Sequence, residues 1–178
     1  MTSPDPVTES AAYQRLLLDF LGADDPAEVQ ATTTAAYRSV VEDAGPLLRV
    51  RPAPREWSVL ELVGHGTDAE LVISGRYRWI LAHDTPGIPG YDQDLWVDRL
   101  RHNDDDPERL LATFATLRDA NLELWRRTPV ADRARYGVHS ERGPESYELT
   151  FRLAAGHDRF HVQQARRTLD AVRAAAEA

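Results

Sequence analysis

The sequence predicts an all-α fold: a four-helix bundle with long inter-helix crossings and a short extra helix at the N-terminus. Apolar residues recur at steps of three and four over long stretches, which is the periodicity of an amphipathic helix. Capping residues, prolines and glycines divide these stretches into separate segments. No stretch alternates strictly between apolar and polar residues for long enough to predict a strand.

The composition excludes several classes of protein. The chain has 178 residues, enough for one core, and is 42% hydrophobic and 28% charged, as is usual for a globular domain. It lacks both the run of ~20 apolar residues that a spanning helix needs and a signal-peptide pattern, so we expect a cytoplasmic protein without membrane partners. The net charge is −8, with arginines scattered among more numerous acids, which disfavours nucleic-acid binding.

Cysteine and lysine are both missing from the chain. There are 0 cysteines, and all 21 basic residues are arginine. This excludes disulfides, thiolate metal sites, a thiol nucleophile of the protein and lysine Schiff-base chemistry. Any reaction of a thiol would have to use an external one.

Caps predict the helices of the first half. Residues 1–24 form a proline-containing arm with a short helix over 11–21, and residues 25–176 form the bundle domain. Asp25 and Pro26 are an N-cap and a first-position proline, and this helix should end near residue 43, before Gly45. Ser58 and Glu61 form a capping box that begins a second helix, reaching about residue 83.

Two long connections separate the remaining helices. Residues 84–106 contain prolines and glycines, and a connection of this length is often functional. Asp106 and Pro107 begin a third helix, which Pro129 ends. A second connection through Gly137 and Gly143 leads to a fourth helix over about 146–175.

The fourth helix carries two histidines four residues apart. His157 and His161 share one face and interrupt a stripe that should point into the bundle, made of otherwise small or apolar residues together with Gln164. Neutral imidazoles there could bind a metal ion at about 2.0–2.1 Å, or could simply be core histidines bonded to backbone. Asp158 stands where the zinc-protease motif needs glutamate, which argues against a protease.

His65 is the best candidate for a third ligand. It lies at the edge of the apolar face of the second helix, which could face the fourth helix across the core. His83 and His102, in or beside the aspartate-bearing connection, should be solvated, and His139 is ambiguous. Gly64 and Gly66 lower helix propensity by roughly 1 kcal/mol each, but could allow helices to approach closely.

Three segments, REWSVLELVGHGTDAE, GRYRWILAHDTPGIPGYDQDLW and YGVHSERGPESYELTFRLAAGHDRFHVQQ, together resemble the DinB-like superfamily of four-helix-bundle metalloproteins. They are most similar to its branch that includes the bacillithiol S-transferases, over about residues 25–170. The resemblance implies a divalent metal site of His65, His157 and His161. Zinc, nickel, iron and manganese all accept imidazole, so the metal is not fixed.

The resemblance and the helical phase also indicate residues beside such a site. A P-x-I-x-x-Y-D-x-x-x-W segment of the family matches residues 86–96. The candidate substrate-binding residues are Trp57, Arg76, Asp92, Trp96, His139 and Gln164. Arg76 could instead be a solvated charge at a helix edge, and Trp96 could only pack its loop down.

Two functions remain open. The first is a metal-dependent enzyme, transferase or hydrolase-like, which the resemblance narrows to transfer of a low-molecular-weight, bacillithiol-like thiol to small electrophiles. The alternative is a non-enzymatic, metal-stabilised bundle acting as a dimeric stress-response or interaction module. We expect a homodimer, because related bundles pair and residues 11–21 are rich in leucine, unless that helix packs on its own bundle.

Overall fold

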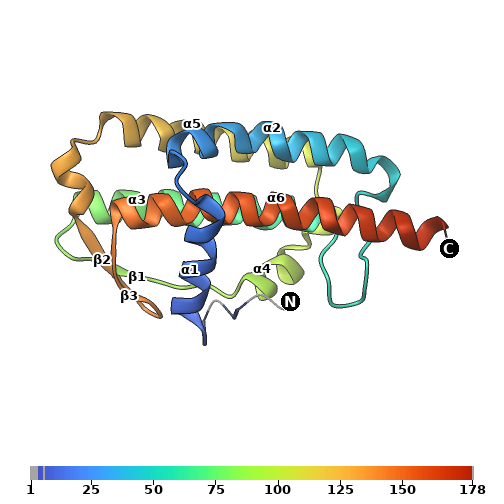
Figure 1. Ribbon diagram of the computed structural model, residues 1–178, viewed down its shortest axis with the longest axis horizontal. Coiled ribbons are helices and arrows are strands. Elements are labelled where there is room, and N and C mark those ends of the chain that lie inside the picture. The colour runs from blue at the N-terminus through green and yellow to red at the C-terminus, as the bar shows by residue number, and fades with distance from the viewer. Residues whose placement is uncertain (1–3, 6, 178) are drawn as a thin grey trace.

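The computed structural model describes residues 4–5 and 7–177; part of the predicted arm, residues 1–3 and 6, and residue 178 lie outside the described residues. Four long helices form the bundle: α2 (Pro26–Ala44), α3 (Val59–Ala82), α5 (Pro107–Arg127) and α6 (Tyr147–Glu177). In Figure 1, α2 and α5 form one layer, and α3 and α6 form the layer beneath it. Within the bundle, α2 contacts α6, α6 contacts α3, α3 contacts α5 and α5 contacts α2. The predicted all-α four-helix bundle is confirmed.

Capping residues fix the starts of these helices as the sequence predicts. The Asp25 carboxylate accepts bonds from the Ala27 and Glu28 amides, and Asp106 caps α5 in the same way. Ser58 and Glu61 make both bonds of the capping box that begins α3. These bonds satisfy amides that would otherwise be orphaned in the first helical turn.

The long connections hold structure that the sequence analysis missed. Between α3 and α5 lie β1 (Gly87–Ile88) and α4 (Gln93–Leu100), and between α5 and α6 lie β2 (Tyr136–His139) and β3 (Gly143–Ser146). β2 is the central strand, parallel to β1 and antiparallel to β3. The expectation of no strands was wrong, because strands of two to four residues are too short for an alternation signal. The small sheet joins the two connections to each other.

Helix α1 (Ser10–Leu21) crosses α6 and, with α4 and the sheet, covers the side of α3 and α6 that faces away from α2 and α5 (Figure 1). Tyr13 and Leu17 pack against Leu153. A Cβ added to Gly156 would lie 1.9 Å from the Leu17 carbonyl oxygen, so the crossing requires glycine there. The leucine-rich segment thus packs on its own bundle, and the predicted homodimer now rests on the family resemblance alone.

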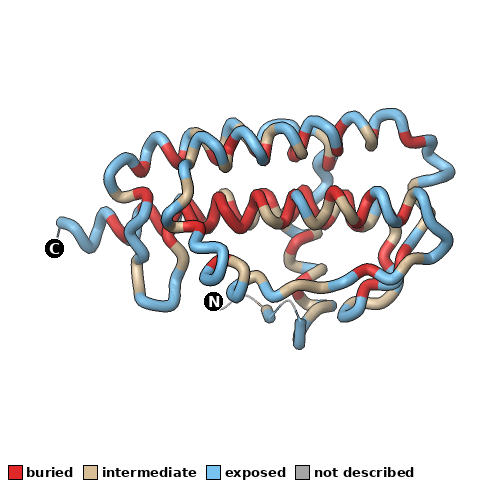
Figure 2. The backbone as a smooth tube through the Cα atoms, turned by 180° about the vertical axis from the view of Figure 1, so that it is seen from behind, coloured by how far each residue is buried: buried red, intermediate tan, exposed pale blue. Residues whose placement is uncertain are grey.

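A buried ion-pair network occupies the middle of the bundle. Arg118 of α5, 2% exposed, donates hydrogen bonds to Glu70 of α3 and Asp158 of α6. Thr33 of α2 donates to Asp158 at 2.9 Å, and Asn121 donates to Glu70 at 2.8 Å. This one network therefore connects all four long helices. Figure 2 shows the buried residues along their inner sides.

His102 is buried rather than solvated, which corrects the prediction; His83 is exposed, as expected. The His102 Nε2 lies 2.6 Å from the Asp68 carboxylate, and the His102 Nδ1 lies 2.7 Å from that of Asp105. These two bonds raise the pKa of His102. A Cβ on Gly64 would lie 2.5 Å from the His102 ring, so this glycine makes room for it. No described helix has the length and apolarity needed to cross a bilayer.

Candidate metal centre

The structure brings the three predicted ligands together. His65 comes from α3, and His157 and His161 come from successive turns of the neighbouring α6. One ring nitrogen from each lies within 4.8 Å of the others. The Nε2 atoms of His65 and His157 are 3.2 Å apart. The three rings converge on one point between the two helices.

The donor set fits a divalent ion. Two nitrogens bound tetrahedrally at about 2.0–2.1 Å are about 3.3 Å apart, close to the observed Nε2 separation. Both ring nitrogens of His161 are buried and, within the described part of the chain, make no hydrogen bond of normal geometry, although the Gln164 side chain is near enough to oppose the lowering of its pKa. A buried polar atom without a partner is destabilising, and coordination would remove that cost. His65, His157 and His161 are therefore the residues that would hold the ion.

Burial keeps the three imidazoles in the form that binds metal. It lowers the pKa of His65, His157 and His161 well below the ordinary value, and is the largest cause in each case. Neighbouring histidines lower the pKa further, His161 acting on His65, His65 on His157 and His157 on His161. At neutral pH all three rings are neutral, with lone pairs available for coordination.

Two pockets meet at the histidines. A cavity of about 430 Å³, called here the Arg76 pocket, includes Arg76 and His157 in its lining. A second of about 590 Å³, called here the Trp57 pocket, includes Trp57 and His161. Both are also lined by Tyr13 of α1 and by residues 93–94, which lie in the layer that covers α3 and α6. The histidine group is thus open on two sides.

Four of the candidate substrate-binding residues lie in these pockets near a histidine. The Trp57 ring is 5.0 Å from the His65 ring, and Gln164 lines the same pocket. Arg76 and His139 line the other pocket. Arg76 is only 7% exposed, so it is not the solvated charge that the alternative interpretation favoured.

The other two candidates have structural contacts. Asp92 borders the Arg76 pocket, but its carboxylate caps α4 by accepting a bond from the Leu95 amide at 2.8 Å. The Trp96 ring packs on the Tyr91 ring, with centroids 4.6 Å apart. Trp96 is not among the described residues that line either pocket.

Sequence reasoning missed one pair in the Arg76 pocket. Arg142 donates to Glu145 through Nε at 2.7 Å and through Nη2 at 3.1 Å, and Thr150 also donates to Glu145. Glu145 is buried on β3. Burial alone would raise its pKa, but the hydrogen bond from Arg142 and the positive charge of Arg142 together lower it. The only signal in the sequence is two opposite charges three residues apart, which is common on protein surfaces.

The fold and these residues define a class: a four-helix-bundle protein whose three-histidine group could hold a divalent ion. The chain belongs to the DinB superfamily, whose family model matches residues 28–165. Its structure is similar to that of YfiT from Bacillus subtilis, described as a probable metal-dependent hydrolase with an unusual four-helix bundle topology. The TM-score is 0.74 at 19% identity, covering 94% of this chain and 91% of that one, which shows a shared fold. A comparison with curated proteins gives no match.

Proposed function

We propose that the protein is a divalent-metal-dependent enzyme acting on a small molecule bound beside the three histidines. One observation carries the proposal: His157 and His161 each line a different pocket. Three protein ligands with open space beside them are typical of catalytic metal sites, whereas structural sites are closed by a fourth ligand. The cavity volumes are within the range of small-molecule sites. This arrangement disfavours the purely structural bundle.

The residues around the site have distinct roles in this proposal. His65, His157 and His161 would hold the ion, which when bound supplies the Lewis acidity that lowers the pKa of a water or thiol towards neutrality. The rings of Trp57 and Phe160 lie against His65 and His161 and give the Trp57 pocket an aromatic wall next to the histidines. No catalytic acid or base of the protein is assigned.

We further propose that the reaction transfers a low-molecular-weight, bacillithiol-like thiol to a small electrophile. The family resemblance supports this, and two pockets that share one histidine group could each take one reactant. In the reaction a bond forms between the thiol sulfur and an electrophilic carbon. The leaving group departs with its bonding electron pair, and the thiol proton passes to solvent. Hydrolysis, as described for YfiT, would use water in place of the thiol.

The test combines metal analysis with product analysis. Protein purified without an affinity tag should contain one divalent ion per chain and accelerate conjugation of thiols to a panel of electrophiles. A chelator should abolish the rate, and added metal should restore it. Mass spectrometry separates a thiol adduct from a hydrolysis product. His157→Ala should lose the activity, whereas His83→Ala, at an exposed histidine, should keep it.

Two outcomes would contradict the proposal at different levels. Hydrolysis products without thiol adducts would overturn thiol transfer but keep a metal-dependent enzyme. A fully occupied site with no metal-dependent rate on a broad panel would overturn the enzyme and favour the metal-stabilised interaction module.

The homodimer and the cytoplasmic location stay predictions. Light scattering at micromolar concentration tests the first, and the mass of a monomer would contradict it.

A further inference from the structure

Two buried hydrogen-bond donors in the Arg76 pocket lack an acceptor. They are Nε of Arg76 and Nε2 of His139, whose residues are 7% and 1% exposed. Neither atom has a hydrogen-bond partner among the described residues. Orphaned buried polar atoms are rare in folded proteins, and two that line the same cavity indicate a missing ligand.

The hydrogen bonding of His139 shows that its free nitrogen is a donor. The Glu141 backbone amide donates to Nδ1 of His139 at 3.2 Å, so in the neutral ring the proton is on Nε2. Burial, and then the charges of Arg142 and Arg76, lower the pKa of His139 to about 4. At neutral pH His139 therefore offers an N–H group, and no charge, to the pocket.

Arg76 brings a positive charge that makes no ion pair with any described residue; burial lowers its pKa, and the more distant charges of Glu145 and Glu141 oppose that effect only in part. The Arg76 Nη2 donates to the Pro89 carbonyl at 3.0 Å, and no described carboxylate lies within ion-pair distance of it. Arg142 in the same pocket is different, because Glu145 pairs with it through two bonds. An arginine stays charged even when buried, so its desolvation calls for an anion. The buried part of the pocket has one positive charge in excess.

The remaining charges limit that anion to a single negative charge. Asp5, Asp92, Asp94 and Glu141 are exposed acids that border the same pocket. They would repel a dianion more strongly than a monoanion. A planar carboxylate also matches the fork of donors that a guanidinium presents. A phosphate dianion fits this balance of charges less well.

We infer that Arg76 and His139 bind the carboxylate of a small carboxylic-acid substrate whose other end reaches His157. This rests on the proposed function for the identity of the reacting end. Between the two ends the lining includes apolar side chains: Val72, Ile73 and Leu153. Arg76 lies three helical turns beyond His65 on α3, so the carboxylate would bind in a part of the pocket separate from the histidine group. Arg76 is thus a specificity-determining residue.

Calorimetric titration with a matched set of probes tests the inference on the full metal-loaded chain. The probes are benzoate, its neutral analogue benzamide, and phenylphosphonate. Benzoate should bind at least tenfold more tightly than benzamide, because a hydrogen bond to a charged group is lost in the amide. Phenylphosphonate should bind more weakly than benzoate. Repeating the titration on metal-free protein separates binding at Arg76 from coordination to the metal.

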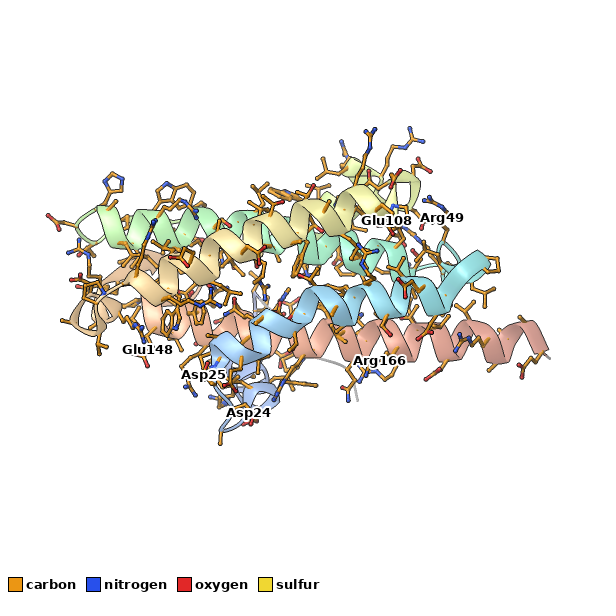
Figure 3. All side chains as sticks on the ribbon, turned by 90° about the horizontal axis from the view of Figure 1, so that it is seen from above. Asp24, Asp25, Arg49, Glu108, Glu148 and Arg166 are labelled. Carbon is orange, nitrogen blue, oxygen red and sulfur yellow. The ribbon has the colours of Figure 1, made fainter. Side chains whose placement is uncertain are left out.

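Two variants and a control locate the effect. Arg76→Gln should lower benzoate affinity at least tenfold and leave benzamide affinity unchanged. Arg76→Lys keeps the charge, so it should keep a preference for benzoate even if the glutamine variant folds poorly. Arg166→Gln removes an arginine that lies exposed on α6 (Figure 3) and should change neither affinity.

The inference and the proposed function fail separately. Equal affinity of the wild type for benzoate and benzamide would overturn the carboxylate site, even if metal-dependent turnover is present. An equal loss of benzoate affinity in Arg76→Gln and Arg166→Gln would also overturn it. Selective benzoate binding to a protein without metal-dependent turnover would support the site and count against the enzyme.

Discussion

Two polar clusters of the bundle contain adjacent residues of α6, Asp158 and His157. They differ in how many of their polar atoms have hydrogen-bond partners in the protein. Asp158 belongs to the ion-pair network, in which all three guanidinium nitrogens of Arg118 have protein partners. His157 belongs to the histidine group, in which both ring nitrogens of His161 make no hydrogen bond of normal geometry in the described chain. A fully paired cluster fixes the helices relative to one another, and a cluster with free lone pairs is prepared for a ligand.

The largest expected effect comes from breaking the paired cluster. Arg118→Met leaves the buried carboxylates of Glu70 and Asp158 without their cation, so the free energy of unfolding should fall by about 3–5 kcal/mol. Urea denaturation of the metal-free protein measures it. Arg38→Met is the matched control, because Arg38 pairs with Glu108 in solvent and should lose less than about 1 kcal/mol. Equal losses in both variants would show that the network does not anchor the bundle.

Replacing a metal-ligating histidine should have the opposite result: metal binding is lost and the fold is kept. His161→Ala should lower metal affinity by more than about 100-fold, since even a residue that only orients a ligand contributes 10- to 100-fold. The helical circular-dichroism spectrum should remain. Metal analysis of the purified variant is the measurement, with His83→Ala as control. Stoichiometric metal in His161→Ala would remove that residue from the ligand set.

Added metal should stabilise the folded protein only by binding to the histidine group. At a free ion concentration 100 times the Kd, the wild type should gain about 2.7 kcal/mol of unfolding free energy, because the ion binds the folded state. Thermal unfolding with and without metal measures the gain. Arg118→Met should show the same gain from metal, although its free energy of unfolding without metal is lower. A gain retained in His161→Ala would place the ion elsewhere.

A further effect concerns pH and accumulates gradually over the titration. Folded-state pKa values of His65, His157 and His161 lie below the unfolded value of about 6.5, so the unfolded state takes up more protons as pH falls. Metal-free stability should therefore be complete above pH 6.5 and decrease below it, by at most about 1.4 kcal/mol per pH unit for each histidine. His161→Ala should reduce this slope in urea titrations; an unchanged slope would contradict the pKa assignment.

His102 should act in the other direction. Its pKa is raised by Asp68 and Asp105, so its contribution is complete below about pH 6.5 and is lost as pH rises through the folded-state pKa. His102→Gln should flatten that limb of the stability profile and keep most of the acidic limb, because burial and His161 lower the pKa of His65 more than the charge of His102 does. Complete loss of the acidic limb in this variant would contradict burial as the main cause of that limb.

The sequence predicted features with a local cause and missed those that depend on distant partners. Caps such as Asp25 and Ser58 act within a few residues, so helix starts could be predicted closely. Leu117 continues the apolar periodicity of α5, yet it is only half-buried, whereas the next residue, Arg118, is fully buried. Arg118 can be buried because acids on two other helices neutralise it, which local periodicity cannot reveal.

The candidate site divides in the same way. The spacing of His157 and His161 placed both on one face, and the resemblance supplied His65. The burial of Arg76 could not be predicted, because it depends on the loop at Pro89 folding over α3. The pairing of β1 with β2, which places His139 in the pocket, likewise comes from segments about 50 residues apart.

The contact of Gly156 with Leu17 connects the size of one residue to the shape of both binding cavities. Helix α1 can cross α6 this closely only where the residue before His157 has no side chain, and the crossing places Tyr13 in the wall of each pocket. In relatives with a larger residue at this position, an equivalent helix would have to move outward and widen the site. The size of the residue before the first histidine of the pair is thus expected to determine which substrates fit.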